Sequence, residues 1–246
     1  DKTIHFDDCE HAADAVVARR NKKAMFTLEE VKKAVGGRIV YKVEDNVFAT
    51  SVEVKGVSTD TRTIQQGDIF FALPGENFDA NKFLGDAIKY GACAVVTNDE
   101  SRVPDGAVAI IVDNTIDALG LLANHYRFKL GCKVIAITGS VGKTSTRTMI
   151  TEVLKTGLKV HSTVANNNNE IGMSKTILSA PEDSEVIVVE MGMRGEGQIS
   201  YLTKIARPDI AIITNVGYSH IGILGSKESI LKAKMEICEG LTDGGI

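Results

Sequence analysis

The fold is decided by the stretch Lys133-Val-Ile-Ala-Ile-Thr-Gly139-Ser-Val-Gly142-Lys143-Thr144-Ser145, in which an apolar run gives way to a glycine turn. The order predicts a strand, a phosphate-binding turn and a helix that begins at the lysine. Glycines let backbone N–H groups approach a polyphosphate, and the N-terminus of a helix attracts anions. Lys143 would reach the β- and γ-phosphates, and the Thr144 hydroxyl would hold Mg²⁺. The predicted phosphate-binding residues are Gly139, Ser140, Val141, Gly142, Lys143, Thr144 and Ser145.

This turn departs from the usual pattern in one respect. The standard motif has another glycine five positions before Gly142, where this chain has Ile137. The turn is therefore shorter at its start. The alternative interpretation is an ordinary glycine turn between a strand and a helix.

The composition restricts the class of protein. The 246 residues are 43% apolar and carry a formal net charge of −4. Such a chain is globular with at least one sizeable core, and two cores fit the length better. Acidic and basic residues are interspersed, which speaks against nucleic acid as a partner. Apolar runs are far shorter than the roughly 20 residues of a membrane span, and residues 1–25 lack a secretory signal, so we expect a cytoplasmic protein.

Four scattered cysteines without C-x-x-C spacing favour neither a zinc site nor a disulfide framework. We interpret them as ordinary core or surface residues.

Residues 26–113 have the pattern of a small α/β domain, and the extension 1–25 has no assigned role. Thr27 and Glu30 form a capping box at a helix start, Phe26 is placed to pack on Val31, and Gly36-Gly37 ends the helix. Beyond it we expect strands around 47–54, 68–73, 93–97 and 108–112, and a helix over about 80–90.

From residue 114 to 246, long helices alternate with apolar strands. We expect strands over 134–138, 185–190 and 209–214, and helices over about 115–129, 143–155, 197–206 and 226–240. The predicted fold class is α/β: a small N-terminal α/β domain followed by an incomplete doubly wound, P-loop ATPase-type parallel sheet. Ligands of such sheets bind at the carboxyl ends of the strands.

Two polar residues stand at those ends. Glu190 closes the strand 185–190 and is a candidate Mg²⁺ ligand beside Thr144, because Mg²⁺ prefers carboxylate and hydroxyl oxygens. The alternative is a solvated glutamate at a strand end. His220 follows the strand 209–214; a structural and a functional role weigh about equally for a single histidine, and this placement favours function.

Lys234 lies on the apolar face of the helix 226–240, a face shared with Ile230, Leu231, Ile237 and Cys238. A lysine there either extends its amine to solvent or has a lowered pKa and takes part in chemistry. Lys232 is instead expected to be solvated and paired with the acidic residues four positions away, Glu228 and Glu236.

The polar stretch Asn166-Asn-Asn-Asn169-Glu170-Ile-Gly172 lies after a short strand and before a helix. It is either a turn with a helix N-cap or a loop that lines a ligand site. The residues alone leave both open.

The stretch 136–145 resembles the ATP loop of the Mur ligases, which also lack the first glycine of the standard motif and whose reaction is amide formation. Four further stretches resemble the branch of that family that adds D-Ala-D-Ala to UDP-N-acetylmuramoyl-tripeptide (UDP-MurNAc-tripeptide). They are Ser58-Thr-Asp60-Thr61-Arg62 with Gly67-Asp68-Ile-Phe-Phe-Ala-Leu-Pro-Gly75-Glu76; Asn166 to Gly172; Glu190-Met-Gly192-Met-Arg194-Gly195-Glu-Gly197; and Thr214-Asn215-Val-Gly217 through His220 to Gly225-Ser226-Lys227-Glu228. The resemblance covers about Phe26 to Ile246.

The resemblance implies ATP and Mg²⁺ as cofactors, and UDP-MurNAc-tripeptide and D-Ala-D-Ala as substrates in peptidoglycan synthesis. It implies catalytic roles for Lys143, Glu190, His220 and Lys234, and Mg²⁺ ligation by Thr144, Glu190, His220 and a carbamylated Lys234. Carbamylation agrees with the apolar position, because it needs a neutral amine and burial lowers the pKa of a lysine. The implied substrate residues are Thr61, Arg62, Gly75, Glu76 and Asn77 for the UDP group and Asn166, Asn168, Asn169 and Glu170 for the muropeptide.

Residues 26–113 would then recognise the UDP-muropeptide, and 114–246 would bind ATP. The implied mechanism is attack of the tripeptide carboxylate on the γ-phosphorus, followed by capture of the acyl phosphate by the D-Ala-D-Ala amine; two Mg²⁺ ions and Lys143 would neutralise the transferring group.

Family members have a third, C-terminal domain, whereas this chain ends at Ile246. We expect the chain alone to be a monomer that binds nucleotide or UDP-muropeptide weakly and does not turn over.

Three alternatives stay open. The Mur ligase that adds the third peptide residue has a similar N-terminal domain, although the stretches 166–170 and 190–197 speak against it. Folylpolyglutamate synthase shares the ATP loop but does not account for residues 58–76. The alternative from a different class is a catalytically inactive module that binds a nucleotide or a partner.

Overall fold

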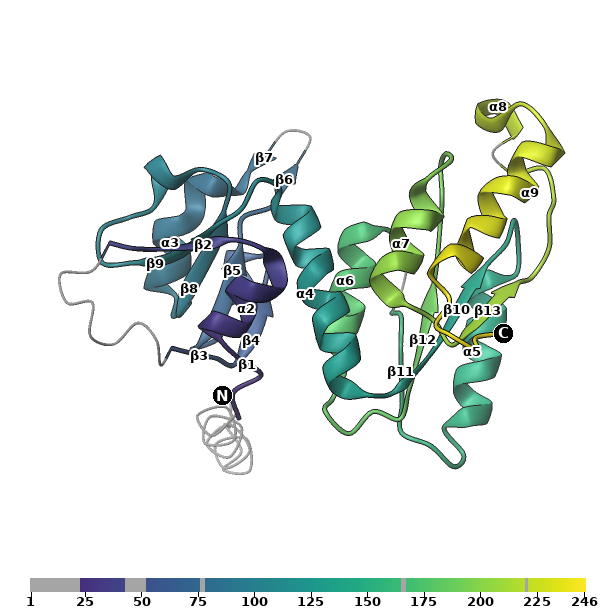
Figure 1. Ribbon diagram of the computed structural model, residues 1–246, viewed down its shortest axis with the longest axis horizontal. Helices are drawn as coiled ribbons and strands as arrows, with labels where there is room; N and C mark the ends of the chain where they lie inside the picture. Colours follow the sequence, from purple (N-terminus) through teal and green to yellow (C-terminus); the bar gives the residue numbers. More distant parts are fainter. Residues whose placement is uncertain (1–22, 43–51, 76–77, 165–166, 220) are drawn as a thin grey trace, which may run out of the picture. The chain divides into compact units, whose positions relative to one another are not determined.

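A computed structural model describes residues 23–42, 52–75, 78–164, 167–219 and 221–246. The chain divides into two compact units, residues 1–115 and residues 116–246, each with a sheet of its own (Figure 1). Within the described residues, no helix has both the length and the apolar character that crossing a bilayer requires.

The amino-terminal unit is built on a mixed five-stranded sheet in the order β2-β9-β8-β5-β4. Strands β4, β5, β8 and β9 run parallel, and β2 pairs antiparallel with β9 at one edge. The short strands β1 and β3 pair with each other, as do β6 and β7. The elements are β1 (Phe26–Thr27), α2 (Leu28–Val35), β2 (Arg38–Tyr41), β3 (Glu53–Val54), β4 (Gly56–Ser58), β5 (Asp68–Phe71), β6 (Pro74–Gly75), β7 (Phe78–Asp79), α3 (Leu84–Lys89), β8 (Ala94–Thr97) and β9 (Val108–Ile111), with 3₁₀ turns at Thr61–Thr63, Ala80–Phe83 and Glu100–Arg102.

Helix α2 begins and ends as predicted. The Thr27 hydroxyl accepts a hydrogen bond from the Glu30 amide at 3.1 Å, and the Glu30 carboxylate accepts one from the Thr27 amide at 2.7 Å. Gly36 closes the helix with φ 67°, a left-handed conformation that glycine adopts without strain. The capping box and the stop signal are therefore confirmed.

The strands expected over 68–73, 93–97 and 108–112 are confirmed as β5, β8 and β9. The helix expected over 80–90 is split into a 3₁₀ turn and α3, which begins only at Leu84. Strands β2 and β4 were not predicted, and most of the stretch 47–54 lies outside the described residues. A buried cluster that includes Phe70, Val95 and Ala109 packs β5, β8 and β9 against Leu84 of α3.

The carboxy-terminal unit contains a four-stranded parallel sheet in the order β11-β12-β10-β13. This confirms the α/β class and the parallel sheet. Its elements are α4 (Thr115–Leu130), β10 (Lys133–Thr138), α5 (Lys143–Leu154), β11 (Val160–Ser162), α6 (Glu170–Leu178), β12 (Val186–Glu190), α7 (Gln198–Ala206), β13 (Ile210–Ile213), α8 (Ile221–Leu224), α9 (Lys227–Met235) and a 3₁₀ turn at Glu236–Gly240.

Helices cover both faces of this sheet. On one face, Ile150 and Leu154 of α5 pack against a buried cluster formed by Ile135, Ile137, Val186 and Val188. Figure 1 shows α4, α6 and α7 on the other side of the sheet from α5. Because β10 and β12 are buried on both faces, they read as continuous apolar runs, the feature from which the parallel sheet was predicted.

The last predicted helix differs from expectation. Helix α9 ends at Met235, and the chain continues to Gly240 as a 3₁₀ turn. Lys232 is exposed, as expected, but forms no ion pair with either acidic residue predicted for it within the described residues; Glu236 instead accepts hydrogen bonds from α7. Leu231, which was placed on the apolar face, is 47% exposed, and Cys238 is also exposed.

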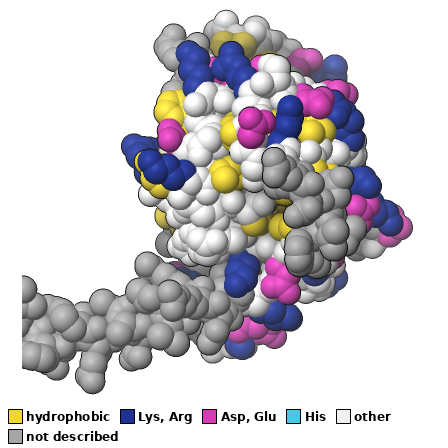
Figure 2. Space-filling model, turned by 90° about the vertical axis from the view of Figure 1, so that its left-hand side faces the viewer, with side chains coloured by type: hydrophobic (Ala, Val, Ile, Leu, Met, Phe, Trp, Pro, Cys, Tyr) yellow, Lys and Arg dark blue, Asp and Glu magenta, His cyan; other side chains and the backbone are white. Residues whose placement is uncertain are grey.

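Figure 2 shows one face of the molecule, on which dark blue basic and magenta acidic side chains alternate and yellow apolar side chains are scattered. The described part of this face therefore carries no broad field of positive charge.

Candidate functional site

The glycine loop joins the carboxyl end of β10 to the start of α5. Gly139 has φ 151°, and a Cβ there would lie 1.9 Å from the Thr214 hydroxyl, so no larger residue fits. Gly142 is the N-cap of α5 and has φ 83°, a left-handed conformation. Each of the two positions therefore requires glycine for a reason of its own: lack of space at Gly139 and a left-handed backbone at Gly142.

The segment that follows β13 braces this loop. The Asn215 side chain accepts from the Val141 amide at 3.2 Å and donates to the Val141 carbonyl at 3.0 Å. The Thr214 hydroxyl donates to the same carbonyl at 2.7 Å, and the Gly217 amide donates to the Ser140 hydroxyl at 2.9 Å. These bonds hold the loop in shape.

Lys143 lies across the loop that precedes it. Its ammonium group donates to the Gly139 carbonyl at 2.9 Å. The amides of the first turn of α5, which includes Thr144 and Ser145, have no partners within the helix. These amides and the ammonium group form a cluster of positively polarised donors, which is the chemistry that binds a phosphate.

Glu190 ends β12 inside the site, with only 5% of its side chain exposed. The Thr144 hydroxyl donates to Oε2 at 2.9 Å, and the Asn168 amide donates to Oε1 at 3.2 Å. The Arg147 guanidinium lies 3.6 Å from Oε2. The alternative of a solvated glutamate is therefore wrong.

The Thr144 and Glu190 oxygens match the donors that Mg²⁺ prefers, so these two residues fit the metal that the family implies. Among the described residues, no group of three or more His, Cys, Asp or Glu side chains could hold a metal ion. A cation at Glu190 would therefore need hydroxyl, water or phosphate oxygens as well. His220, a further implied ligand, lies outside the described residues.

Two asparagines of the predicted muropeptide stretch have different contacts. Asn169 is the N-cap of α6, and its side chain accepts from the Gly172 amide at 2.9 Å. Asn168 binds Glu190 as described above, and its carbonyl accepts from the Gly192 amide at 2.9 Å. Glu170 is the first residue of α6. Asn166 lies outside the described residues.

Lys234 is buried in α9 and only 1% exposed, so the alternative of an amine extended to solvent is wrong. Burial lowers the pKa of Lys234 to about 8, and the charge of Lys143 acts in the same direction. Ile230 and Ile237 share its buried face, as predicted. A neutral amine is therefore accessible near physiological pH, which is the condition for carbamylation.

In the amino-terminal unit, three of the implied UDP residues are described and lie beyond the carboxyl ends of β4 and β5: Thr61, Arg62 and Gly75. Thr61 and Arg62 form the 3₁₀ turn after β4, which Asp60 caps. Asp60 also pairs with the Arg62 guanidinium at 2.5 Å, and this hydrogen bond raises the pKa of Arg62. Gly75 lies in the β6–β7 hairpin. Two further implied residues lie outside the described residues, Glu76 and Asn77.

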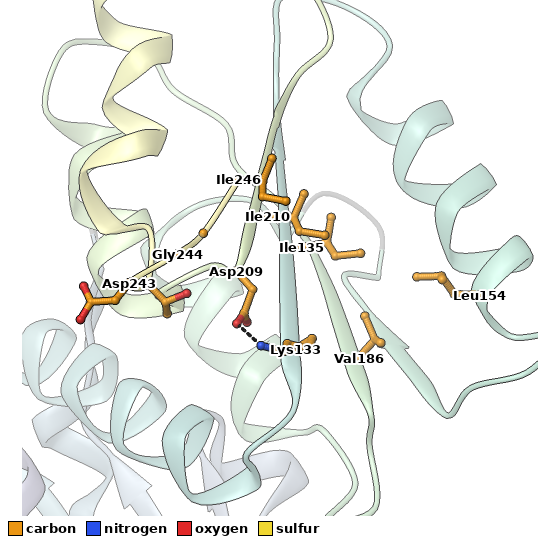
Figure 3. Close-up of a pocket in the computed structure, with 11 residues that line it drawn as sticks. Lys133, Ile135, Leu154, Val186, Asp209, Ile210, Asp243, Gly244 and Ile246 are labelled. Carbon is orange, nitrogen blue, oxygen red and sulfur yellow. Dashed lines mark hydrogen bonds and ion pairs between the residues drawn. The ribbon is translucent and has the colours of Figure 1, made fainter.

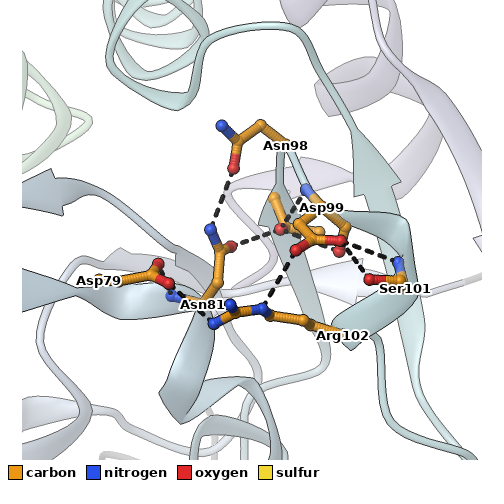
Figure 4. Close-up of polar contacts among 7 residues, drawn as sticks. Asp79, Asn81, Asn98, Asp99, Ser101 and Arg102 are labelled. Carbon is orange, nitrogen blue, oxygen red and sulfur yellow. Dashed lines mark hydrogen bonds and ion pairs between the residues drawn. The ribbon is translucent and has the colours of Figure 1, made fainter.

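A polar network fixes the neighbouring loops (Figure 4). The Asn81 side chain accepts from the Thr97 hydroxyl at 2.6 Å. Arg102 pairs with Asp79 at 2.7 Å and with Asp99 at 3.1 Å. The network therefore joins β7 and the 3₁₀ turn after it to the end of β8 and the 3₁₀ turn that follows that strand. Sequence reasoning missed it, because its members lie far apart along the chain.

A pocket of about 400 Å³ lies at the other end of the strands of the carboxy-terminal unit (Figure 3). Its apolar lining is formed by Ile135, Leu154, Val186, Ile210 and Ile246. The charged residues Lys133 and Asp209, which pair at 2.8 Å, also line it. Lys133 and Asp209 stand at the amino ends of β10 and β13, whereas the glycine loop follows the carboxyl end of β10. The pocket is therefore separate from the glycine loop.

Sequence reasoning did not single out Arg147, Thr214 or Asn215 as site residues. Thr214 and Asn215 directly follow an apolar strand, at the edge where ligands bind, and that position is the signal that could have found them. Arg147 comes one helical turn after Lys143 and so lies on the same face of α5.

Comparison with known proteins extends these observations. The model described as "Mur ligase family, catalytic domain" matches residues 53–127, and the model described as "Mur ligase middle domain" matches residues 137–246. The UDP-N-acetylmuramoyl-tripeptide--D-alanyl-D-alanine ligase of Bacillus subtilis (strain 168) is 45% identical over 194 residues, which are 78% of this chain and 42% of that protein.

Two solved structures are also similar. MurF from Acinetobacter baumannii matches with a TM-score of 0.81 at 31% identity, over 89% of this chain and 47% of that chain. MurF from Thermotoga maritima, in complex with ADP, matches with a TM-score of 0.69 at 34% identity, over 76% of this chain and 43% of that chain. This chain thus spans less than half the length of each of these relatives. It belongs to the Mur ligase family and is MurF-like.

Proposed function

We propose that this chain is the UDP-muropeptide- and ATP-binding portion of a ligase that adds D-Ala-D-Ala to UDP-MurNAc-tripeptide. The observation that carries the proposal is the hydrogen bond from Thr144 to the buried Glu190 at the mouth of the glycine loop. It joins a phosphate-binding turn to a carboxylate, the pairing that a phosphoryl-transfer site requires. The Bacillus subtilis relative is named for this reaction, and the Thermotoga maritima structure contains ADP.

Each unit has a role in this proposal. Residues 26–113 recognise the UDP-muropeptide, with Thr61, Arg62, Gly75, Glu76 and Asn77 at the UDP group. Residues 114–246 bind ATP through the loop 139–145, and the asparagine stretch 166–170 contacts the muropeptide. Thr144, Glu190, His220 and, after carbamylation, Lys234 hold Mg²⁺. Bound Mg²⁺ would supply positive charge against the transferring phosphoryl group.

The proposed reaction forms an amide in two displacements. The terminal carboxylate of the tripeptide attacks the γ-phosphorus of ATP, the bond to the bridging oxygen breaks, and ADP leaves. The D-Ala-D-Ala amine then attacks the carbonyl carbon of the acyl phosphate, and inorganic phosphate leaves as the amine loses a proton. Lys143 neutralises charge on the phosphates, and the braced loop holds them in line for the first displacement.

Calorimetric titration tests the proposal, with ADP in Mg²⁺ and with UDP-MurNAc-tripeptide as separate ligands. We expect the wild-type chain to bind both. Lys143→Ala should raise the dissociation constant of ADP at least about tenfold, because it removes a charge-assisted contact to phosphate. It should leave the affinity for UDP-MurNAc-tripeptide unchanged. Lys155→Ala is the matched control, since Lys155 is an exposed lysine at the end of the same helix, paired only with Glu152 among the described residues.

Absence of binding for both ligands would overturn the proposal and favour a module that binds some other partner. Equal ADP affinity in wild type and Lys143→Ala would show that the glycine loop is not the nucleotide-binding site. A phosphate-release assay with D-Ala-D-Ala examines turnover separately. We expect no release from this chain alone, because it spans less than half of its relatives.

A further inference from the structure

Arg147 brings a partly buried positive charge to the site, and the reaction as proposed leaves it without a role. It lies one turn after Lys143 on α5, and its side chain is only 11% exposed. The guanidinium Nη1 lies 3.6 Å from Oε2 of Glu190, whose side chain is 5% exposed. Two opposite charges are therefore desolvated together at the end of β12.

Among the described residues, the other side-chain contacts of Glu190 do not balance its charge. The Thr144 hydroxyl and the Asn168 amide donate hydrogen bonds to the two carboxylate oxygens, but both groups are neutral. The Lys143 ammonium group is engaged with the Gly139 carbonyl. A buried carboxylate without an opposite charge is strongly destabilising, so the guanidinium stabilises Glu190.

Arg147 and Glu190 attract each other as opposite charges without a close hydrogen bond. At 3.6 Å, the guanidinium does not make a close hydrogen bond to Oε2, and the Thr144 hydroxyl occupies that oxygen at 2.9 Å. A divalent cation at the same carboxylate would be repelled by the guanidinium, and repulsion is strong where water is excluded. The guanidinium and the cation are therefore competing partners of one carboxylate.

We propose that Arg147 is a positioning residue that takes the place of the divalent cation at Glu190, keeping the carboxylate buried and beside Thr144 until nucleotide and cation bind. This inference rests on the proposed function, because it assumes that Mg²⁺ and a nucleoside diphosphate bind at the glycine loop. It gives Arg147 a part in preparing the site and none in contacting the reacting atoms.

The test compares Arg147→Met, Arg147→Lys and the control Lys155→Met. The first measurement is the melting temperature without ligand, and the second is the ratio of the ADP dissociation constants in EDTA and in Mg²⁺. Arg147→Met should melt at least roughly 5 °C lower, because Glu190 loses its charge partner. In this variant, the dissociation constant of ADP in EDTA divided by that in Mg²⁺ should rise at least about tenfold, because Mg²⁺ no longer competes with the guanidinium. Arg147→Lys and Lys155→Met should stay close to wild type in both the melting temperature and this ratio.

A double-mutant cycle keeps the test decisive if Arg147→Met is too unstable to titrate. Glu190→Gln removes the charge that Arg147 balances and keeps the shape of the side chain. In that background, Arg147→Met should lower the melting temperature by less than half of its effect in the wild type. An equal loss in both backgrounds would show that Arg147 acts through packing and would overturn the inference.

Two results separate this inference from the proposed function. If wild type binds ADP better in Mg²⁺ than in EDTA, but Arg147→Met leaves the ratio unchanged or lowers it, only the inference fails. If wild type binds ADP in neither condition, the proposed function fails and the inference fails with it.

Discussion

Single residues in this protein are constrained by what lies across from them in space. Gly139 is required because the Thr214 hydroxyl occupies the space of a side chain, although 75 positions separate the two in the sequence. Lys234 is constrained by burial: the fold places an amine where its charged form is disfavoured. The sequence indicated the apolar face of Lys234 through helical periodicity, but not the obstacle at Gly139.

The pKa of Lys234 leads to a prediction about pH. The unfolded chain keeps this proton up to about pH 10.4, whereas the folded protein releases it near pH 8 because burial lowers the pKa of Lys234 to about 8. The folded protein therefore binds fewer protons in this window, and its stability should rise as the pH increases through it. Below pH 8 both states are protonated, and the unfavourable burial of the charge is complete.

Lys234→Met should therefore raise the free energy of unfolding at pH 7 by roughly 2 kcal/mol and lessen the increase between pH 8 and pH 10. Urea unfolding at pH 7 and pH 9.5, in bicarbonate-free buffer, measures both effects. Lys232→Met, a change to an exposed lysine on the same helix, is the control. A wild-type pH dependence in Lys234→Met would show that another group is responsible.

At the level of elements, α7 is capped from a distant part of the chain. Its N-cap is Gly197, which has no side chain to offer. The Glu236 carboxylate accepts from the Gly197 amide at 2.7 Å and from the Ser200 amide at 3.0 Å. A carboxylate at a helix N-terminus satisfies free amides and interacts favourably with the helix dipole. This contact also explains why Lys232 does not pair with Glu236, one of its two expected partners.

Glu236→Ala should lower the free energy of unfolding of the carboxy-terminal unit by about 1–2 kcal/mol, because the first turn of α7 loses its cap. Chemical denaturation monitored by circular dichroism measures this change. Lys232→Ala should have an effect below about 0.5 kcal/mol, as expected for an exposed residue. A larger effect for Lys232→Ala than for Glu236→Ala would favour the i, i+4 pair that the sequence suggested.

The elements differ in how well the sequence predicted them. Local signals are reliable where cause and effect lie within a few residues: the α2 capping box, the apolar runs of β10 and β12, and the glycine loop were all recognisable. Short strands at the edge of the first sheet, β2 and β4, were not, because their formation depends on partners elsewhere in the chain. The same reason hid Arg147 and Asn215, whose contacts with Glu190 and Val141 span 43 and 74 positions.

For the whole molecule, the division into two units determines how a ligand stabilises it. The glycine loop and Glu190 belong to the carboxy-terminal unit, and the 3₁₀ turn with Arg62 belongs to the other. Each unit has its own sheet and its own buried core. A ligand that binds one unit should stabilise that unit by mass action and affect the other little.

Scanning calorimetry should therefore show two unfolding transitions. ADP with Mg²⁺, at about 100 times the dissociation constant of ADP, should raise the midpoint temperature of one of them by roughly 5 °C or more. Hydrogen exchange should assign the raised transition to residues 116–246. Lys143→Ala removes the shift if the ligand acts at the glycine loop. A single transition would mean that the units unfold as one.

The bonds from Thr214 and Asn215 to the glycine loop have a consequence for the timing of binding. A loop that is already shaped does not delay the encounter while it searches for a competent conformation. The main contact that an arriving phosphate has to replace is the one from Lys143 to the Gly139 carbonyl. Nucleotides with different numbers of phosphates should therefore arrive at similar rates, and the phosphates should set how long each of them stays.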